Sequence, residues 1–166
     1  MQENALLRIG KVIKPHGLKG KLKVLLYTSN PYKTTWVYLK PKGGFMRLYK
    51  VTSIKPLKGH YIIGLEGIKD LEQARSFVGA SVYCKKEDLP PLGEDEYYWY
   101  QVIGLKVYFD SGEYLGKVTH VFNAGSSDIF VVRNSKEYLI PAIVDVIKAF
   151  DWEKGVLWIT KMEGLL

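Results

Sequence analysis

The segment KPHGLKGKLKVLL, residues 14–26, sets the β architecture of the first half of the chain. In its second half, Leu22, Val24 and Leu26 alternate with residues 21, 23 and 25, two of which are lysines. This period of two, with one apolar face and one largely basic face, predicts a half-buried β-strand. In its first half, a proline fixes one backbone torsion and two glycines permit positive φ, which predicts a tight turn between two strands.

Further short segments rich in β-forming residues surround this hairpin and are separated by Pro and Gly turns. They cover residues 6–14, 36–39, 45–54, 61–65 and 81–84. One helix is expected, with Asp70 as its N-cap, Gln73 three residues later and Gly79 at its end. Because closure removes exposed strand edges, several short strands with tight turns predict a small β-barrel.

The second half of the chain has the same character and predicts a second small all-β unit. Strands are expected at residues 104–109, 113–122, 129–132, 138–140 and 156–159. Residues 144–150 fit a strand or a helix equally well. The fold class predicted from the sequence is therefore all-β, with two small β-barrels.

An acidic, proline-rich segment separates the two halves. Residues 86–96 contain two prolines, one glycine and five acidic residues. Consecutive prolines disfavour both a helix and a central strand, so we interpret this segment as an inter-domain linker. The predicted domains are residues 1–86 and 97–166, joined by a linker over residues 87–96.

The composition excludes several classes of protein. The chain has 166 residues, of which 47% are hydrophobic and 25% are charged, too apolar for a disordered chain. No segment approaches the roughly 18 apolar residues of a membrane-spanning helix, and no heptad pattern persists. The single cysteine, Cys84, cannot form an internal disulfide, so a reducing compartment, the cytoplasm, is expected.

Charge is unevenly distributed along the sequence. The net charge is +7, but residues 1–88 hold 17 basic and 6 acidic residues, whereas residues 89–166 hold 7 basic and 11 acidic ones. Such a one-sided field in the first half favours a polyanionic partner such as nucleic acid. The alternative is an ordinary basic surface in contact with solvent only.

The turn and strand of residues 14–23 hold the densest group of basic residues. They could contact a phosphate backbone through lysines and exposed amides, or they could form a glycine-rich turn with solvated lysines. The spacing is not that of a P-loop. The candidate RNA-facing residues are Lys14, His16, Gly17, Lys19, Gly20, Lys21 and Lys23.

Four consecutive aromatic residues, from Tyr97 to Tyr100, follow the acidic segment. They cannot all point to one face of a regular element. Tyr and Trp are common anchors of protein interfaces, so these side chains either bind a partner or pack at the seam between the two domains. Both roles are compatible with the sequence.

Signals for catalysis are weak. The histidines His16, His60 and His120 are far apart in sequence, and no metal-ligand spacing or nucleophile motif occurs. Asp128 lies beside a turn and is interpreted as a surface carboxylate or a cap, as are Asp110 and Glu113. We therefore expect no catalytic residue, metal or cofactor.

Several motifs together resemble the RimM family of bacterial ribosome maturation factors. Residues 10–12 and 14–20 resemble its N-terminal signature, and residues 97–99 with 103–105 resemble the entry to its second domain. Residues 113–118, 136–143 and 145–146 resemble its PRC-barrel motifs, and residues 164–166 resemble its tail. Their order and spacing cover nearly the whole chain. The chain has Ser127 and Asp128 where the family often has Asn-Asp.

The resemblance implies a six-stranded N-terminal barrel related to translation-factor barrels, followed by a PRC barrel. It implies a non-enzymatic factor that assists assembly of the small-subunit head and processing of small-subunit ribosomal RNA. The implied partners are the immature small ribosomal subunit, its ribosomal protein number nineteen and nearby RNA. By this similarity Tyr97 and Tyr98, with Trp99 beside them, are the candidate ribosomal-protein-binding residues. The alternative is a free-standing RNA-binding β-barrel protein with an accessory domain.

Overall fold

A long β-hairpin opens the first half of the chain. In the computed structural model, which describes residues 6–161, β1 (Leu6–His16) runs antiparallel to β2 (Lys21–Leu26). The turn between the strands contains Gly17 and Gly20, whose φ angles are 73° and 87°. The two glycines therefore adopt the positive φ that the sequence predicts.

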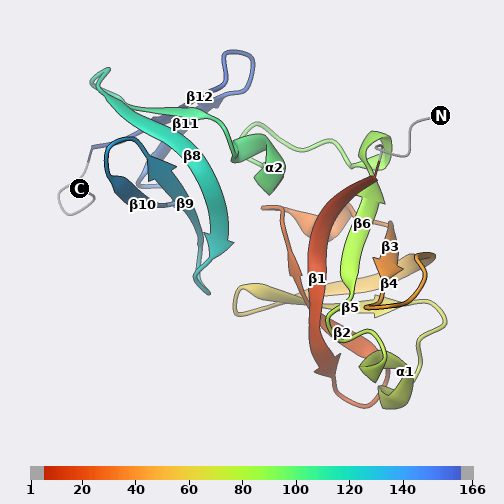
Figure 1. Ribbon diagram of the computed structural model, residues 1–166. Helices are drawn as coiled ribbons and strands as arrows, with labels where there is room; N and C mark the ends of the chain where they lie inside the picture. The colour runs from red at the N-terminus through yellow and green to blue at the C-terminus, as the bar shows by residue number, and fades with distance from the viewer. Residues whose placement is uncertain (1–5, 162–166) are drawn as a thin grey trace. The chain divides into compact units, whose positions relative to one another are not determined.

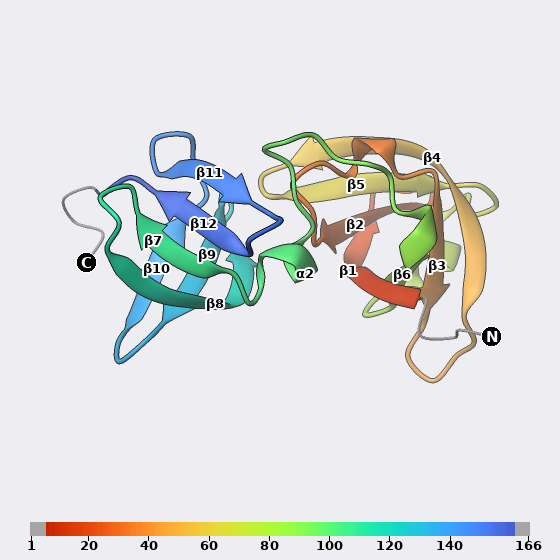
Figure 2. The same ribbon diagram turned by 90° about the horizontal axis from the view of Figure 1, so that it is seen from above.

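Six strands close into a barrel in the first half, in the order β1-β2-β5-β4-β3-β6 (Figures 1 and 2). The strand β1 pairs with β6 along residues 6–11 and with β2 along residues 10–16, and the register shifts once within each pairing. The remaining strands are β3 (Trp36–Lys40), β4 (Arg47–Leu57), β5 (His60–Leu65) and β6 (Ser81–Lys85).

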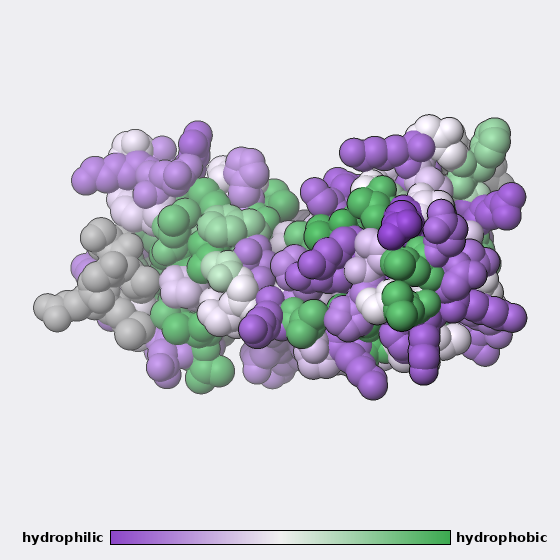
Figure 3. Space-filling model, turned by 90° about the horizontal axis from the view of Figure 1, so that it is seen from below, coloured by the Kyte–Doolittle hydropathy of each residue, from purple (hydrophilic) through white to green (hydrophobic). Residues whose placement is uncertain are grey.

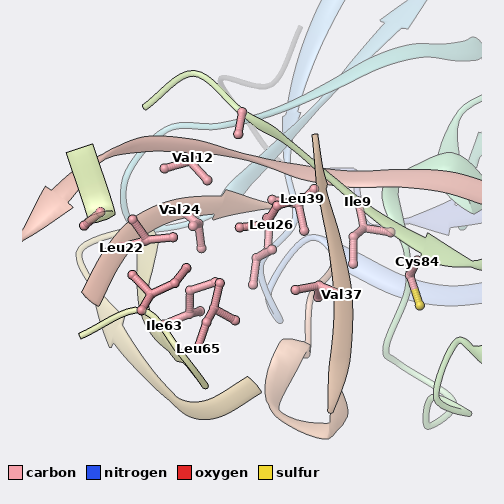
Figure 4. Packing of buried hydrophobic residues seen from close by; sticks show 14 residues of the cluster. Ile9, Val12, Leu22, Val24, Leu26, Val37, Leu39, Ile63, Leu65 and Cys84 are labelled. Atoms are coloured by element: carbon pink, nitrogen blue, oxygen red, sulfur yellow. The ribbon is translucent and has the colours of Figure 1, made fainter. Parts of the chain in front are cut away.

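Alternating residues of these strands fill the barrel (Figure 4). Leu22, Val24 and Leu39 have 0% exposure, as expected for the inward positions of strands with period two. Partly buried side chains of β4, Val51 and Ile54, pack against this cluster. The barrel therefore has its own hydrophobic core, and its outward positions are free to carry polar residues.

The short helix α1 (Leu71–Arg75) begins as the sequence predicts, because Asp70 Oδ1 accepts a 2.8 Å hydrogen bond from the Gln73 backbone N–H. The helix ends at Arg75, four residues before Gly79. Single 3-10 turns, η2 (Pro31–Lys33) and η3 (Lys86–Asp88), complete the first half.

The second half forms a six-stranded sheet in the order β10-β9-β8-β7-β12-β11. The strand β11 overlaps residues 144–150, the segment whose sequence fits a strand and a helix equally well. The single turn α2 (Trp99–Val102) was not predicted. The strands are β7 (Lys106–Phe109), β8 (Tyr114–Asn123), β9 (Asp128–Arg133), β10 (Glu137–Pro141), β11 (Ile147–Asp151) and β12 (Val156–Ile159).

The all-β fold class is confirmed. The backbone contacts divide the chain into two units, Met1–Pro91 and Leu92–Leu166. Part of the acidic segment belongs to the first unit, because Leu89 packs against its core and Lys33 Nζ donates a hydrogen bond of 3.3 Å to the Pro91 carbonyl oxygen. The domain limits at residues 86 and 97 stay a prediction.

Candidate functional site

The hairpin of the first unit brings four of the predicted RNA-facing residues onto one outer surface. In the register of β1 and β2, Lys14 lies opposite Lys23 and His16 lies opposite Lys21. Residues that face each other across antiparallel strands point to the same side of a sheet. Their neighbours Leu22 and Val24 point into the core, so these four side chains face outward.

The tip of the hairpin is exposed to solvent, whereas the last residue of its turn is packed against another part of the chain. Gly17 and Lys19 are exposed, and Leu18 between them is 75% exposed. Gly20 is buried against the chain that precedes α1, because a Cβ built there would lie 2.5 Å from the Ile68 carbonyl oxygen. Gly20 thus supports the turn by close backbone packing, whereas Gly17 and Lys19 lie at its surface.

A row of cations crosses the outside of the barrel from this hairpin. Lys23 is paired with Ile62 of β5, which in turn is paired with Lys55 of β4. We call Lys14, Lys23 and Lys55 the lysine row. None of the three forms an ion pair with another described residue. Like charges directly opposite on neighbouring strands are destabilising, so the row favours an anion.

Lys21 differs from the lysine row because it is used by the barrel itself. Its Nζ donates a 3.0 Å hydrogen bond to Ser53 Oγ of β4. The side chain crosses β5 over Gly64, where a Cβ would lie 2.7 Å from Ser53 Oγ and 3.3 Å from Lys21 Nζ. Gly64 therefore leaves the space in which Lys21 joins β2 to β4.

The aromatic segment of the second unit is largely buried. The exposed fractions of Tyr97, Tyr98 and Trp99 are 6%, 5% and 8%, while Tyr100 is 38% exposed. Tyr97 contributes to the core, with its ring centroid 5.4 Å from that of Phe130. A direct contact between these three side chains and a ribosomal protein stays a prediction. Because all three are buried, only a small part of their surface is available for such a contact.

Asp128, at the start of β9, organises this segment. Its Oδ2 accepts hydrogen bonds from the Tyr97 hydroxyl at 2.7 Å and from Trp99 Nε1 at 3.0 Å. Its Oδ1 accepts a 3.0 Å bond from Asn123 Nδ2, and its carbonyl oxygen accepts one from the Ala142 N–H. The interpretation of Asp128 as a surface carboxylate or a simple cap is therefore wrong, because three side chains converge on it.

A pocket of about 220 Å³ lies beside Tyr97 in the second unit. Its walls include Phe150 and Lys148 of β11 and the apolar residues Ile143 and Val144. Val144 is 93% exposed and Ile143 is 41% exposed, so apolar surface extends out of the pocket. Asp128 holds Tyr97 through its carboxylate and residue 142 through its carbonyl, and thereby fixes two walls of the pocket relative to each other.

Sequence reasoning missed the organising role of Asp128 and the part of residues 143 and 144 in the pocket, because the contacts that reveal both join segments far apart in the sequence. Within residues 6–161, no group of three or more His, Cys, Asp and Glu side chains is arranged to hold a metal ion. In the same range, no helix has the length and hydrophobicity that a membrane span requires.

Comparison with known proteins agrees with this two-unit architecture. Residues 7–89 match the model of the RimM N-terminal domain, and residues 99–165 match that of the RimM PRC barrel domain. The chain belongs to the RimM family. The prediction of a six-stranded barrel followed by a PRC barrel is thereby confirmed.

Named relatives match this chain over nearly its full length. A protein named ribosome maturation factor RimM from Pelobacter propionicus is 38% identical over 170 residues, covering 100% of this chain and 98% of the relative. Its counterpart from Thermosipho africanus is 40% identical over 159 residues, covering 92% and 89%. A crystal structure of a RimM protein from Pseudomonas aeruginosa is 26% identical, with a TM-score of 0.49 and coverage of 95% and 98%.

Proposed function

We propose that the chain is a non-enzymatic ribosome maturation factor. It assists assembly of the small-subunit head and processing of the small-subunit ribosomal RNA by binding ribosomal protein number nineteen and nearby RNA. Membership in a family whose relatives are named ribosome maturation factors supports this role. We also propose that the protein acts in the cytoplasm, where a factor for small-subunit assembly meets its target.

The lysine row is the observation that carries the RNA-binding part of the proposal. Three cations lie across the outer surface of one barrel, and none of them has an ionic partner among the described residues. Phosphates would relieve the repulsion between Lys14 and Lys23 and release counterions, which makes RNA binding favourable and dependent on salt.

The pocket beside Tyr97 supports the protein-binding part. Protein interfaces combine an apolar centre with a polar rim, and the pocket has apolar walls next to Asp95 and Lys148. Tyr97 lies on its wall rather than on an open surface. We therefore propose that Tyr97 holds the pocket wall in position and also contributes a small area of contact with the protein partner.

Binding alone can provide the assembly function. A ligand with higher affinity for the native arrangement of the head than for competing arrangements shifts the population toward the native one. This mechanism needs no reacting group. It requires only that the two units bind the RNA and the ribosomal protein together when these partners are in their native arrangement.

Sedimentation of a cell lysate that contains a tagged copy tests the proposal. We expect the tagged protein to migrate with precursor small subunits and to be absent from mature ones. Lys14→Glu/Lys23→Glu should weaken this association, whereas Lys136→Glu/Lys154→Glu, the matched charge change at exposed lysines of the second unit, should retain it. A tagged protein that never migrates with precursor subunits contradicts the proposal.

The protein contact is tested separately by substitution at the rim of the pocket. Val144→Asp places a charge on a 93% exposed side chain without disturbing the core. We expect it to reduce recovery of ribosomal protein nineteen, whereas Val78→Asp, at a 43% exposed position of the first unit, should not. Full RNA binding by the wild type without any preference for that protein would favour the alternative of a free-standing RNA-binding barrel.

A further inference from the structure

A second basic surface lies on the outside of β3 and β6, which carry no residue of the lysine row and stand between β4 and β1 in the order of strands around the barrel. In the register, Tyr83 of β6 pairs with both Arg8 of β1 and Tyr38 of β3. In the next outward row, Ser81 pairs with both Lys11 and Lys40. We call this surface the β3–β6 face; it comprises Arg8, Lys11, Trp36, Tyr38, Lys40, Lys42, Ser81 and Tyr83.

The alternation of β3 fixes the orientation of this face. Val37 and Leu39 are 2% and 0% exposed and point into the barrel, so Trp36, Tyr38 and Lys40 point outward. Trp36 is 50% exposed, although indole is among the largest apolar side chains. The strand therefore presents two aromatic rings and a cation along one line. Figure 2 shows β3 and β6 side by side in the barrel.

Four cations gather around a pocket at one end of the face. The pocket has a volume of about 320 Å³ and is lined by Arg8, Lys11, Lys40 and Lys42, together with Ser81 and Tyr83. Lys42 lies along Gly79, where a Cβ would be 3.0 Å from Lys42 Cε. None of the four cations forms an ion pair with a described residue. The pocket is thus suited to an anion that is small enough to enter it.

An aromatic pocket lies on the other side of the Tyr38–Tyr83 row. It has a volume of about 480 Å³, within the range of small-molecule sites, and its walls include Trp36, Tyr38 and Leu48. Lys85 and Asp88 also line it. The carboxylate of Asp88 disfavours a phosphate there, but it can accept a hydrogen bond from the exocyclic amino group of a base.

The cationic pocket is suited to a phosphate and the aromatic pocket to a base. The two are adjacent, because the paired residues Tyr83 and Tyr38 line one pocket each. We propose that the β3–β6 face binds unpaired RNA, with a base stacked on Trp36 and Tyr38 and an adjacent backbone phosphate in the pocket of four cations. Exposed aromatic rings next to a cationic groove are the combination by which proteins hold single strands. On the side of the first unit that Figure 3 shows, purple polar side chains surround green apolar ones.

This chemistry distinguishes unpaired RNA from other anionic partners. A duplex keeps its bases stacked inside the helix, so it can use the cations but not the rings. An acidic peptide such as polyaspartate has no aromatic ring to stack on Trp36. The inference rests on the proposed function and deepens it, because it specifies the form of RNA that the first unit recognises.

Fluorescence anisotropy of the full-length chain with a labelled, unstructured RNA 12-mer tests the stacking contact. We expect Trp36→Ala to weaken binding about tenfold, and Trp36→Phe, which keeps a ring, to restore most of the affinity. Tyr32→Ala removes a 53% exposed ring outside the face and should change binding less than twofold. Binding to a blunt duplex of equal length should not respond to Trp36→Ala.

The salt dependence of the same binding reaction tests the phosphate pocket. Lys40→Ala/Lys42→Ala should reduce the slope of log K against log salt by about 0.7, the contribution of the one single-strand phosphate that the pocket neutralises. Trp36→Ala should leave the slope unchanged. Lys106→Ala/Lys136→Ala, which removes two exposed lysines of the second unit, should leave both slope and affinity unchanged.

Three outcomes would overturn the inference: equal binding of single strand and duplex, unchanged affinity of Trp36→Ala, or complete displacement of the RNA by equimolar polyaspartate. If any of them occurs while the tagged protein still migrates with precursor small subunits, the β3–β6 face is not the RNA site but the proposed function stands. If the protein binds the 12-mer as expected but never associates with those subunits, the proposed function fails and the stacking site remains.

Discussion

The hydroxyl of Tyr97 and the carboxylate of Asp128 are joined by a 2.7 Å hydrogen bond, although 31 positions separate them in sequence. The same carboxylate oxygen accepts the Trp99 indole N–H, so one side chain fixes two members of the aromatic segment. The bonded carboxylate is part-buried, where hydrogen bonds to a charged group are stronger than those between neutral groups. The arrangement of this segment therefore depends on a residue in a different strand.

Removal of this carboxylate should destabilise the second unit. In Asp128→Ala, the Tyr97 hydroxyl and Trp99 Nε1 lose their common acceptor, and we expect the free energy of unfolding to fall by about 2–3 kcal/mol. Urea unfolding followed by tryptophan fluorescence measures it. Glu113→Ala removes only an exposed ion pair with Lys161 and should cost less than about 1 kcal/mol. Equal effects of the two substitutions would show that Asp128 has no organising role.

Repulsion within the lysine row should limit the stability of the first unit. Lys23→Gln removes a cation directly opposite Lys14, so we expect stability to rise by about 0.2–1 kcal/mol at low salt. In 1 M salt the Debye length is about 3 Å, and the gain should disappear. Thermal unfolding at both salt concentrations measures this difference. Lys136→Gln, in the turn before β10, serves as control; a gain in it as large as that of Lys23→Gln would argue against local repulsion.

The two glycines of the hairpin turn should differ in their sensitivity to alanine. Gly17 and Gly20 both have positive φ, but a Cβ has open space at Gly17 and lies 2.5 Å from the Ile68 carbonyl oxygen at Gly20. We expect Gly17→Ala to cost about 1 kcal/mol from backbone strain alone and Gly20→Ala to cost at least about 2 kcal/mol. Denaturant unfolding of the full chain measures both. A smaller cost at Gly20 than at Gly17 would contradict the close packing seen there.

The stability of the first unit should fall in alkaline solution through its buried thiol. Burial raises the pKa of Cys84 above its ordinary value of 9.0, and the nearby Asp88 carboxylate raises it further. The folded state therefore holds the thiol proton more strongly than the unfolded state does. The associated stability is complete below pH 9 and is lost as the pH rises through the higher pKa of the folded state.

Melting temperatures between pH 7.5 and 10.5 test this dependence. Cys84→Ala has a lower melting temperature throughout because it leaves a small void, but it should lose less stability than the wild type between pH 9 and 10.5. All other ionisable groups are the same in both proteins, so the difference between the two curves isolates the thiol. Parallel curves would exclude a contribution from Cys84.

Local patterns were sufficient to predict most of the elements. The alternation of Leu22, Val24 and Leu26 predicted β2, and Asp70 with Gln73 predicted the start of α1, because both signals act within a few residues. The single turn α2 was missed, since four consecutive aromatic residues have no helical period.

The candidate sites were predicted less completely than the fold. The contact of Asp128 with Tyr97 and the assembly of Arg8, Tyr38 and Tyr83 into one surface depend on strand register between distant segments. No periodicity in the sequence encodes that register. The hairpin lysines were identified because they are neighbours along the chain as well as in space.

The closed barrel has a consequence for how its binding properties can change. Since each of its six strands is hydrogen-bonded to a neighbour on both sides, no strand edge remains to accept an added strand. Recognition by this unit must come from outward side chains and turns, which can be exchanged while the interior stays intact. The specificity of the first unit can therefore be redesigned, or can drift during evolution, largely independently of its folding.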